Sequence, residues 1–156
     1  MRRRGRGGPA AGGDLSRRVS PRAPRGLARV VVLDAGVVIA LFSPDDAHHD
    51  RAKALFVRQA GPFLLHSLTV AETLVVAARV EREGELWDAL RSLGGEVAAM
   101  GPDEPLLLAR LRATHALEMP DTCVLAVAVH LRVPIATFDT RLAAVADEMS
   151  LLFSVD

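Results

Sequence analysis

The stretch that decides the fold begins with Pro120-Asp-Thr-Cys-Val-Leu-Ala-Val-Ala128 and ends a few residues later with Ile135-Ala-Thr-Phe-Asp139. An acid opens the almost wholly apolar run over 121–132, which is typical of a buried helix. The short apolar run over 133–138 is typical of a buried strand, and a second acid follows it directly. Both acids therefore stand where an apolar element begins or ends, and not on an ordinary solvated face.

Outward from this stretch, short apolar strands alternate with helices along the chain. We expect strands at 29–33, 63–66, 97–100, 133–138 and 151–155, and helices at 36–42, 47–60, 68–80, 82–93, from Gly101-Pro102 to about 117, 121–132 and 140–148. Asp45 or Asp46 is expected to cap the second helix, and Ser67 the third. This alternation predicts right-handed βαβ units and a parallel sheet buried on both faces. The predicted fold class is therefore α/β.

The chain divides into a basic segment and an acidic domain. Residues 1–29 hold nine Arg and one acid, a net charge of +8, whereas residues 30–156 hold ten Lys and Arg and eighteen Asp and Glu, a net charge of −8. No hydrophobic period runs through the first segment, which holds six of the twelve Gly. We expect residues 1–28 to be a disordered tail and residues 29–156 to be one folded domain. The tail could be an electrostatic arm for RNA, a solvated extension or the result of a start codon assigned too far upstream.

Composition argues against several classes of protein. The single cysteine, Cys123, rules out an intramolecular disulfide framework and a Cys-rich zinc site, and we expect it to be buried and reduced. Aromatic residues make up only 4% of the chain, which argues against a stacking platform for single-stranded nucleic acid. No uninterrupted apolar run reaches about 18 residues, and the tail lacks the apolar stretch of a secretory signal. We therefore expect a cytoplasmic protein that does not enter a membrane.

Four acids stand at positions where a carboxylate is unusual. Asp34 and Asp139 each follow a strand directly, at the carboxyl ends of the strands where ligands bind in parallel sheets. Asp121 lies in the first turn of the apolar helix, and Glu72 shares a helix face with three apolar side chains: Leu68, Val75 and Val76. Carboxylates gathered without a cation would repel one another. A hard divalent cation such as Mg²⁺ or Mn²⁺, which takes oxygen ligands, would relieve that repulsion.

Each acid also has a plain structural interpretation. Asp121 could be a helix N-cap, and Asp34 and Asp139 could be the polar ends of strands. Glu72 is the hardest to explain in this way, because its neighbours on the predicted helix are apolar. Sequence spacing by itself does not establish that the four carboxylates converge.

Four segments resemble the acidic motifs of PIN domains, and look most like those of VapC-type toxins from bacterial toxin–antitoxin pairs. The segments are Val30-Val-Val-Leu-Asp34, Ser67-Leu-Thr-Val-Ala-Glu72, Met119-Pro-Asp121 and Ala136-Thr-Phe-Asp139. The resemblance covers about 30–156, and it implies a three-layer α/β/α PIN-like fold with a central, mostly parallel sheet. Thr137 matches a frequent small hydroxyl residue of the family. The chain departs from many relatives at Ala35-Gly36, where they carry Thr and then Ser or Asn, and this raises the question of how tightly Asp34 is held.

The resemblance also implies an activity, the metal-dependent hydrolysis of RNA phosphodiester bonds by an endoribonuclease. It makes Asp34, Glu72, Asp121 and Asp139 the catalytic quartet and Mg²⁺ the cofactor, with Mn²⁺ as a substitute. We assign Asp34 and Asp121 as direct metal ligands and Asp139 as a direct or water-mediated one. Glu72 is then an outer ligand, or the group that orients the attacking water.

Toxins of this kind pair with a small antitoxin protein and form homodimers, so the resemblance implies both partners for this chain. The helices at 68–80 and 82–93 carry many apolar positions, which could form a partner surface or pack on each other as an αα-hairpin: Leu74, Val75, Val76, Leu86, Trp87 and Leu90.

Three other classes of protein compete with this interpretation. A phosphatase of the haloacid-dehalogenase type needs a second Asp two residues after the first, where this chain has Gly36. A response-regulator receiver needs a Lys after a late strand, but the only Lys is Lys53. A catalytically inactive PIN-like module that only grips an antitoxin or RNA stays open, and a divalent-metal titration separates it from an enzyme. The adjacent His48-His49 could bind a metal, although capping or surface packing is the commoner role at this spacing.

Overall fold

The computed structural model describes residues 30–59 and 61–154, and over this range the chain forms four strands and seven helices. The predicted disordered tail at 1–28 lies outside the described residues. The strands are β1 (Val31–Leu33), β2 (Phe63–Leu65), β3 (Gly95–Val97) and β4 (Ile135–Ala136). The helices are α1 (Ala35–Phe42), α2 (His49–Arg58), α3 (Ser67–Ala78), α4 (Glu83–Ser92), α5 (Glu104–His115), α6 (Met119–Leu131) and α7 (Thr140–Glu148).

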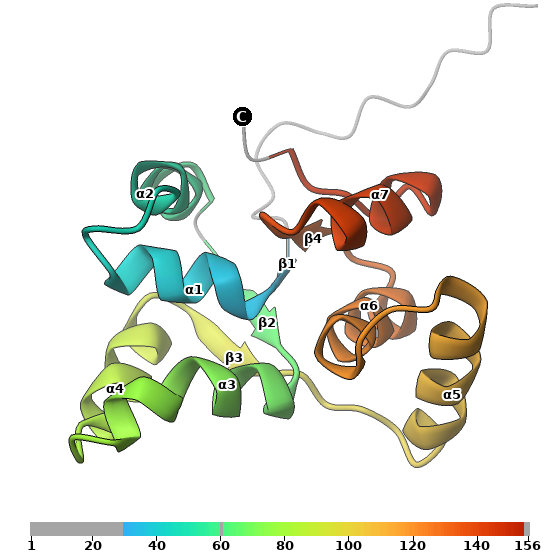
Figure 1. The fold of residues 1–156 in the computed structure, drawn as a ribbon, viewed down its shortest axis with the longest axis horizontal. Helices are drawn as coiled ribbons and strands as arrows, with labels where there is room; N and C mark the ends of the chain where they lie inside the picture. The colour runs from blue at the N-terminus through green and yellow to red at the C-terminus, as the bar shows by residue number, and fades with distance from the viewer. Residues whose placement is uncertain (1–29, 60, 155–156) are drawn as a thin grey trace, which may run out of the picture.

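The strands form one sheet in the order β3-β2-β1-β4, and all of its described pairs are parallel. Helices α1 to α4 lie on one side of this sheet and α5 to α7 on the other (Figure 1). Side chains along β1 alternate between these sides. Val32 joins the core under α5, α6 and α7, whereas Val31 and Leu33 join the core under α1 to α4. The predicted three-layer α/β/α fold with a parallel sheet is therefore confirmed.

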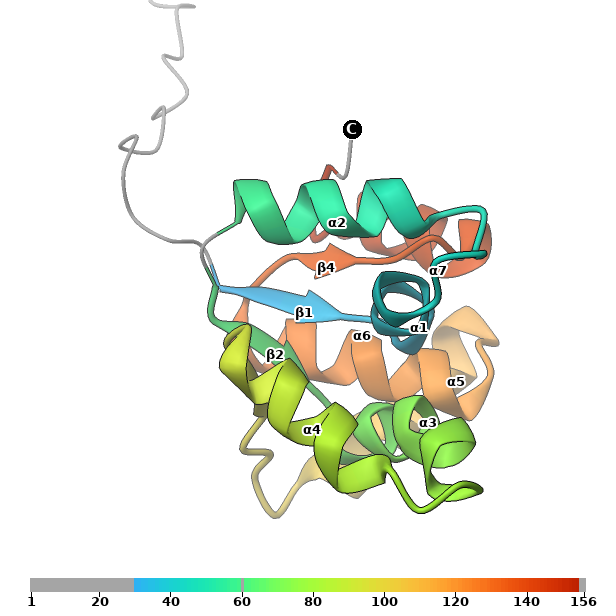
Figure 2. The same ribbon diagram turned by 90° about the vertical axis from the view of Figure 1, so that its left-hand side faces the viewer.

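The register of the sheet places the end of β1 beside the end of β4. Leu33 pairs with Ala136, and the N–H of Asp34 donates to the carbonyl oxygen of Ala136 at 3.1 Å. Figure 2 shows β1 and β4 running in the same direction, with α1 beginning where β1 ends. Residues that follow these two strands therefore meet at one edge of the sheet.

Helix α6 is the apolar element that the sequence indicated. Seven consecutive residues, Thr122 to Ala128, are buried, and the helix contacts β1, β2 and β4. It begins at Met119, two residues before the predicted start. Pro120 belongs to its first turn, where the missing N–H of proline costs no hydrogen bond.

Three predicted strands differ from the structure. The strand expected at 133–138 is shorter, because β4 contains only Ile135–Ala136. The strand expected at 97–100 lies earlier, at Gly95–Val97. A Cβ at Gly95 would stand 2.7 Å from Cγ of Leu90, so only glycine lets the strand begin this close to α4. The strand expected at 151–155 is wrong within the described residues, which end at 154. Leu152 makes only an isolated parallel bridge to Ile135.

Two predicted helix caps are also wrong. Helix α2 begins at His49, and Asp46 accepts a hydrogen bond from the N–H of His48 without capping the helix itself. Helix α3 includes Ser67, and its cap is the preceding residue, His66, whose ring nitrogen Nδ1 accepts from the N–H of Leu68 at 3.0 Å. In the part of the chain that the structure describes, none of the helices is long and apolar enough to span a membrane.

Candidate active site

Asp34 occupies the N-cap position of α1, but its carboxylate turns towards β4. The hydroxyl of Thr137 donates to Oδ2 of Asp34 at 2.7 Å, and the same hydroxyl oxygen accepts from the N–H of Asp139 at 3.0 Å. Burial raises the pKa of Asp34 above its ordinary value, and the negative charge of Asp139 acts in the same direction. The hydrogen bond from Thr137 opposes this rise in pKa, because it stabilises the ionised carboxylate.

This contact answers the question raised by Ala35-Gly36. Neither residue has a side-chain hydroxyl or amide that could orient Asp34, and Thr137 supplies that hydrogen bond from the neighbouring strand instead. A Cβ at Gly36 would lie 3.8 Å from Oδ2 of Asp34, an ordinary contact distance. The carboxylate is therefore oriented by Thr137, more than a hundred positions away, together with backbone hydrogen bonds from Ala35 and Gly36.

Asp139 caps α7 and is exposed to solvent. Its Oδ1 accepts from the N–H of Leu142 at 2.7 Å, which satisfies one of the free donors of the first turn. The plain interpretation of Asp139 as a capping residue is thus correct for one of its oxygens. Its charge nevertheless raises the pKa of both Asp34 and Asp121, so its carboxylate belongs electrostatically to the same site.

Asp121 lies in the first turn of α6 and is the most perturbed of the four acids. Its pKa is raised from 3.8 to about 6, most strongly by burial and then by the negative charges of Asp34, Asp139, Glu72 and Glu118, in that order. The N-cap of α6 is Glu118, so Asp121 is not the cap of its helix. The pKa of Asp121 is therefore affected by the charges of all three other members of the predicted quartet.

Glu72 reaches the site from α3, but for a different reason from the one predicted. Its three apolar neighbours on the helix are exposed, and the buried side of α3 carries Thr69, Val70 and Thr73. Glu72 itself is half-buried. Burial and the negative charge of Asp34 both raise its pKa. The prediction of a carboxylate on a buried apolar face is therefore wrong, whereas its nearness to Asp34 holds.

The four carboxylates lie within electrostatic range of one another without meeting at a single point. Within residues 30–59 and 61–154, no three His, Cys, Asp or Glu side chains stand as a group able to hold a metal ion. These observations agree, because charges interact over several ångströms, whereas Mg²⁺ needs oxygens at about 2.0–2.1 Å. Oxygens of Asp34 and Asp139 are also turned to protein donors.

The donor chemistry at this edge suits a hard divalent cation. The pKa values of Asp34, Glu72 and Asp121 are all raised, so like charges and burial outweigh the hydrogen bonds that favour ionisation. A divalent cation among these oxygens would reverse that balance, and oxygen is the ligand atom that Mg²⁺ and Mn²⁺ prefer. The residues present therefore fit such an ion, provided that their side chains close on it.

A partly buried pair, His66 and Glu104, was not predicted from the sequence. His66 and Glu104 are 38 residues apart, yet His66 Nε2 lies 2.5 Å from Oε1 of Glu104. Because Nδ1 of the ring accepts from Leu68, Nε2 carries the proton and donates it to the carboxylate. The pair joins the start of α3, which carries Glu72, to the start of α5. The sequence indicates that a helix begins near His66 and another near Glu104, but no sequence pattern indicates that the two side chains are in contact.

The remaining predicted residues have structural roles. Cys123 is free and buried as expected, and burial raises the pKa of its thiol, as do the charges of Glu104 and Glu72. His49 contacts the carbonyl oxygen of Ala40 through Nδ1, at 2.8 Å. His48 stacks on Phe138. The adjacent histidines therefore take part in packing, His49 against the backbone of α1 and His48 against Phe138.

The sequence and the fold were compared with those of known proteins. The family model described as PIN domain matches residues 31–148. A chain of a toxin–antitoxin complex from Klebsiella pneumoniae has a TM-score of 0.67 and 20% identity, covering 81% of this chain and 98% of that one. VapC20 of Mycobacterium tuberculosis, titled a sarcin–ricin loop cleaving toxin, has a TM-score of 0.63 and 18% identity, covering 74% and 94%. A Pyrobaculum aerophilum protein has a TM-score of 0.51 and 22% identity, covering 76% and 85%. At these identities the structures share the fold, and the search of curated proteins found no match.

Proposed function

The chain belongs to the PIN-domain family, and from that premise we propose that it is a metal-dependent endoribonuclease that hydrolyses RNA phosphodiester bonds. The observation that carries the proposal is the raised pKa of Asp121, which is set by burial and by the charges of Asp34, Asp139 and Glu72. Acids that destabilise one another in this way fit a site built for a cation. A fold alone would not specify this chemistry.

Asp34, Asp121 and Asp139 would hold Mg²⁺, or Mn²⁺ in its place, and Glu72 would act as an outer ligand or orient the attacking water. The ion would supply a water of lowered pKa and neutralise the charge that develops on the phosphate. Carboxylates are suitable partners because they can also accept the proton of that water.

The protein's own residues prepare this site in two ways. Thr137 donates to Asp34 and accepts from the N–H of Asp139, so one hydroxyl fixes the relative placement of two acids. Such outer contacts commonly set the affinity of a metal site. The like charges around Asp121, which raise its pKa in the metal-free chain, also favour a cation at this position.

We further propose that the chain is the toxin of a type II toxin–antitoxin pair that acts in the cytoplasm, forms a homodimer and binds a small antitoxin. Support comes from two structural neighbours, one titled a toxin–antitoxin complex and the other a sarcin–ricin loop cleaving toxin. The surface offers a second reason. Val75, Val76 and Val80 of the α3 region are exposed, and a cavity of about 550 Å³ lies between α1, α3 and α4. Leu90 is buried and Trp87 is half-buried, as packing of the two helices would require, but the exposed valines of the α3 region remain uncovered.

The decisive experiment is cleavage of RNA by the purified chain with Mg²⁺, with Mn²⁺ and with EDTA. We expect cleavage only with a divalent ion, and its loss in Asp34→Asn and Asp121→Asn while the fold persists. Glu118→Gln removes a charge from the neighbourhood of Asp121 without touching the quartet, so it should remain active. RNA or antitoxin binding that needs no metal, together with absent cleavage, would instead identify an inactive binding module.

A further inference from the structure

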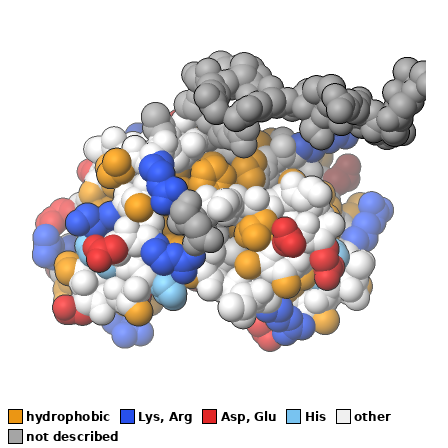
Figure 3. Space-filling model, turned by 90° about the horizontal axis from the view of Figure 1, so that it is seen from above, with side chains coloured by type: hydrophobic (Ala, Val, Ile, Leu, Met, Phe, Trp, Pro, Cys, Tyr) orange, Lys and Arg blue, Asp and Glu red, His pale blue; other side chains and the backbone are white. Residues whose placement is uncertain are grey.

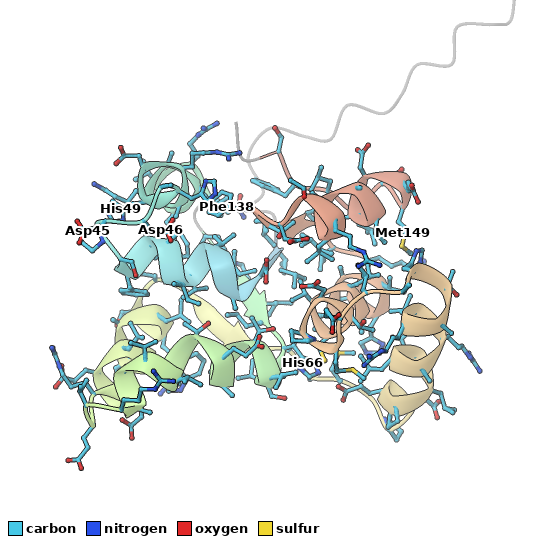
Figure 4. The ribbon with its side chains drawn as sticks, in the orientation of Figure 1. Asp45, Asp46, His49, His66, Phe138 and Met149 are labelled. Carbon is cyan, nitrogen blue, oxygen red and sulfur yellow. The ribbon has the colours of Figure 1, made fainter. Side chains whose placement is uncertain are left out.

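A stack of three side chains includes Phe138, the residue before Asp139, and we call His48, Arg51 and Phe138 the α2 clamp. The rings of His48 and Phe138 are stacked, with centroids 4.6 Å apart and planes 24° from parallel. The guanidinium carbon of Arg51 lies 5.0 Å from the centroid of the Phe138 ring, within the range of a cation–π contact. Figure 4 shows Phe138 between α2 and α7, on the side of the molecule where α2 lies.

The α2 clamp is tied covalently to the site. Phe138 stands between Thr137, which donates to Asp34, and Asp139, which acts on the pKa of Asp121. Its ring is half-buried against the core under α1 to α4, so its orientation is fixed by packing. The stack therefore places a guanidinium and an imidazole against the residue that precedes Asp139, and α2 itself contributes none of the four acids.

An acidic site that acts on RNA needs cations nearby, since the phosphate backbone is negative and is held by neutralising side chains. Figure 3, which views the molecule from above, shows Lys and Arg side chains over the side where α2 lies. Arg51 is exposed. A guanidinium that lies over an aromatic ring can still donate from its edge, and this suits a phosphate oxygen.

We propose that the α2 clamp binds the RNA backbone next to the scissile bond, with Arg51 donating to a phosphate oxygen and with His48 and Phe138 holding Arg51 in place. The inference rests on the proposed ribonuclease function and adds the residues that position its substrate. Acids also lie in this region. Asp45 and Asp50 are exposed, and Asp46 accepts the N–H of His48. These acids reduce the positive potential around the clamp. General electrostatic attraction is therefore weak there, and binding depends on the hydrogen bond that Arg51 donates to the phosphate.

The test compares Arg51→Gln with Lys53→Gln. Both substitutions remove one positive charge from α2, but residues two apart on a helix face different directions, so Lys53 points away from the stack. Phe138→Leu is the second variant, because it keeps an apolar side chain in the core and removes the ring. Thermal unfolding of each full-length variant establishes that it is folded, and Arg51→Lys, which keeps the charge but loses the planar fork, replaces Arg51→Gln if that variant does not fold.

The first readout is steady-state cleavage of a mixed-sequence RNA oligonucleotide with Mg²⁺ over a range of salt concentrations. We expect Arg51→Gln to raise KM by about 3-fold to 10-fold, with a smaller effect on kcat, and to flatten the salt dependence of kcat/KM by about 0.7 in logarithmic slope. Phe138→Leu should raise KM in the same direction. Lys53→Gln should leave KM close to that of the unaltered chain.

The second readout is fluorescence anisotropy of the same labelled oligonucleotide in EDTA, where no cleavage is expected. Equal KM values and equal affinities for Arg51→Gln and Lys53→Gln would overturn the α2 clamp while leaving the nuclease intact. A chain that binds the oligonucleotide through Arg51 but never cleaves it would contradict the proposed function and support the clamp. A chain that neither binds nor cleaves it would overturn both.

Discussion

The hydroxyl of Thr137 donates to Oδ2 of Asp34 at 2.7 Å, across 103 residues of sequence. Because Ala35 and Gly36 have no polar side chain, this contact orients the first acid of the quartet. The same oxygen accepts the N–H of Asp139, so it links the ends of β1 and β4. The hydroxyl of Thr137 therefore forms hydrogen bonds with two of the proposed metal ligands, Asp34 and Asp139.

Replacing Thr137 by Val should lower kcat/KM for RNA cleavage by about 10-fold to 100-fold, the usual loss when a ligand-orienting contact is removed. Val has nearly the same shape, so the buried position should still be filled and the melting temperature nearly kept. Thr137→Ser keeps the hydroxyl and is the matched control. Activity of the Val variant equal to that of the Ser variant would show that Asp34 needs no such contact.

Asp121 should make the metal-free protein less stable as the pH rises. Its pKa is about 6 in the folded chain against an ordinary value of 3.8, so the folded state holds the proton more tightly between these values. The penalty is absent below 3.8 and complete above about 6. Asp121→Asn should therefore raise the free energy of unfolding near pH 7 by about 1 kcal/mol, a figure reduced for the partial exposure of the group.

Urea unfolding in EDTA at acidic and neutral pH measures this directly. The difference between Asp121→Asn and the unaltered chain should appear near neutral pH and vanish in acid. A variant that is less stable at neutral pH would show instead that Asp121 is held by a favourable partner.

Glu72→Gln should leave the metal-free protein equally stable or slightly more so at neutral pH. Burial and the charge of Asp34 both raise the pKa of Glu72, so neutralising it removes a repulsion. Glu96→Gln, at an exposed position of β3, provides the control for loss of one negative charge. A lower melting temperature for Glu72→Gln alone would place Glu72 in a structural pair.

His66→Ala should destabilise the fold by about 1–2 kcal/mol, because α3 loses its cap and Glu104 loses its donor. His66→Asn can still cap the helix, so it should recover part of that loss. Glu104→Gln can still accept from Nε2 and should cost less than His66→Ala. Urea unfolding of the three variants orders them, and equal stability of His66→Ala and the unaltered chain would contradict the role of the cap.

Much of the fold could be predicted because local patterns determine it. The apolar run of α6 and the strand directly before Asp34 have no other plausible place than the core. Side-chain caps were harder, since His66 is not among the usual cap residues and Ser67 is. The position of β3 depends on the fit of Gly95 against Leu90, which no local pattern reveals.

The positions of the four acids relative to the strands and helices could be predicted, but their contacts could not. Asp34 follows β1 and Asp139 follows the segment of β4. Because these strands are parallel neighbours, both acids lie at one edge of the sheet. The apolar neighbours of Glu72 indicated burial, but α3 turns its threonines inward and leaves those neighbours exposed. The contact from Thr137 to Asp34 joins two strands distant in sequence, so it becomes visible only once the register is known.

If the acids at this edge form a site for a divalent cation, the chain should bind Mn²⁺, which calorimetry and thermal unfolding both measure. A ligand that binds only the folded chain stabilises it by about 2.7 kcal/mol at a hundredfold excess over its Kd. We predict saturable Mn²⁺ binding with a rise in melting temperature for the unaltered chain and for Glu118→Gln, and the loss of both effects in Asp34→Asn and Asp121→Asn. Equal Mn²⁺ binding by all four proteins, or by none of them, would show that Asp34 and Asp121 do not form a site for a divalent cation.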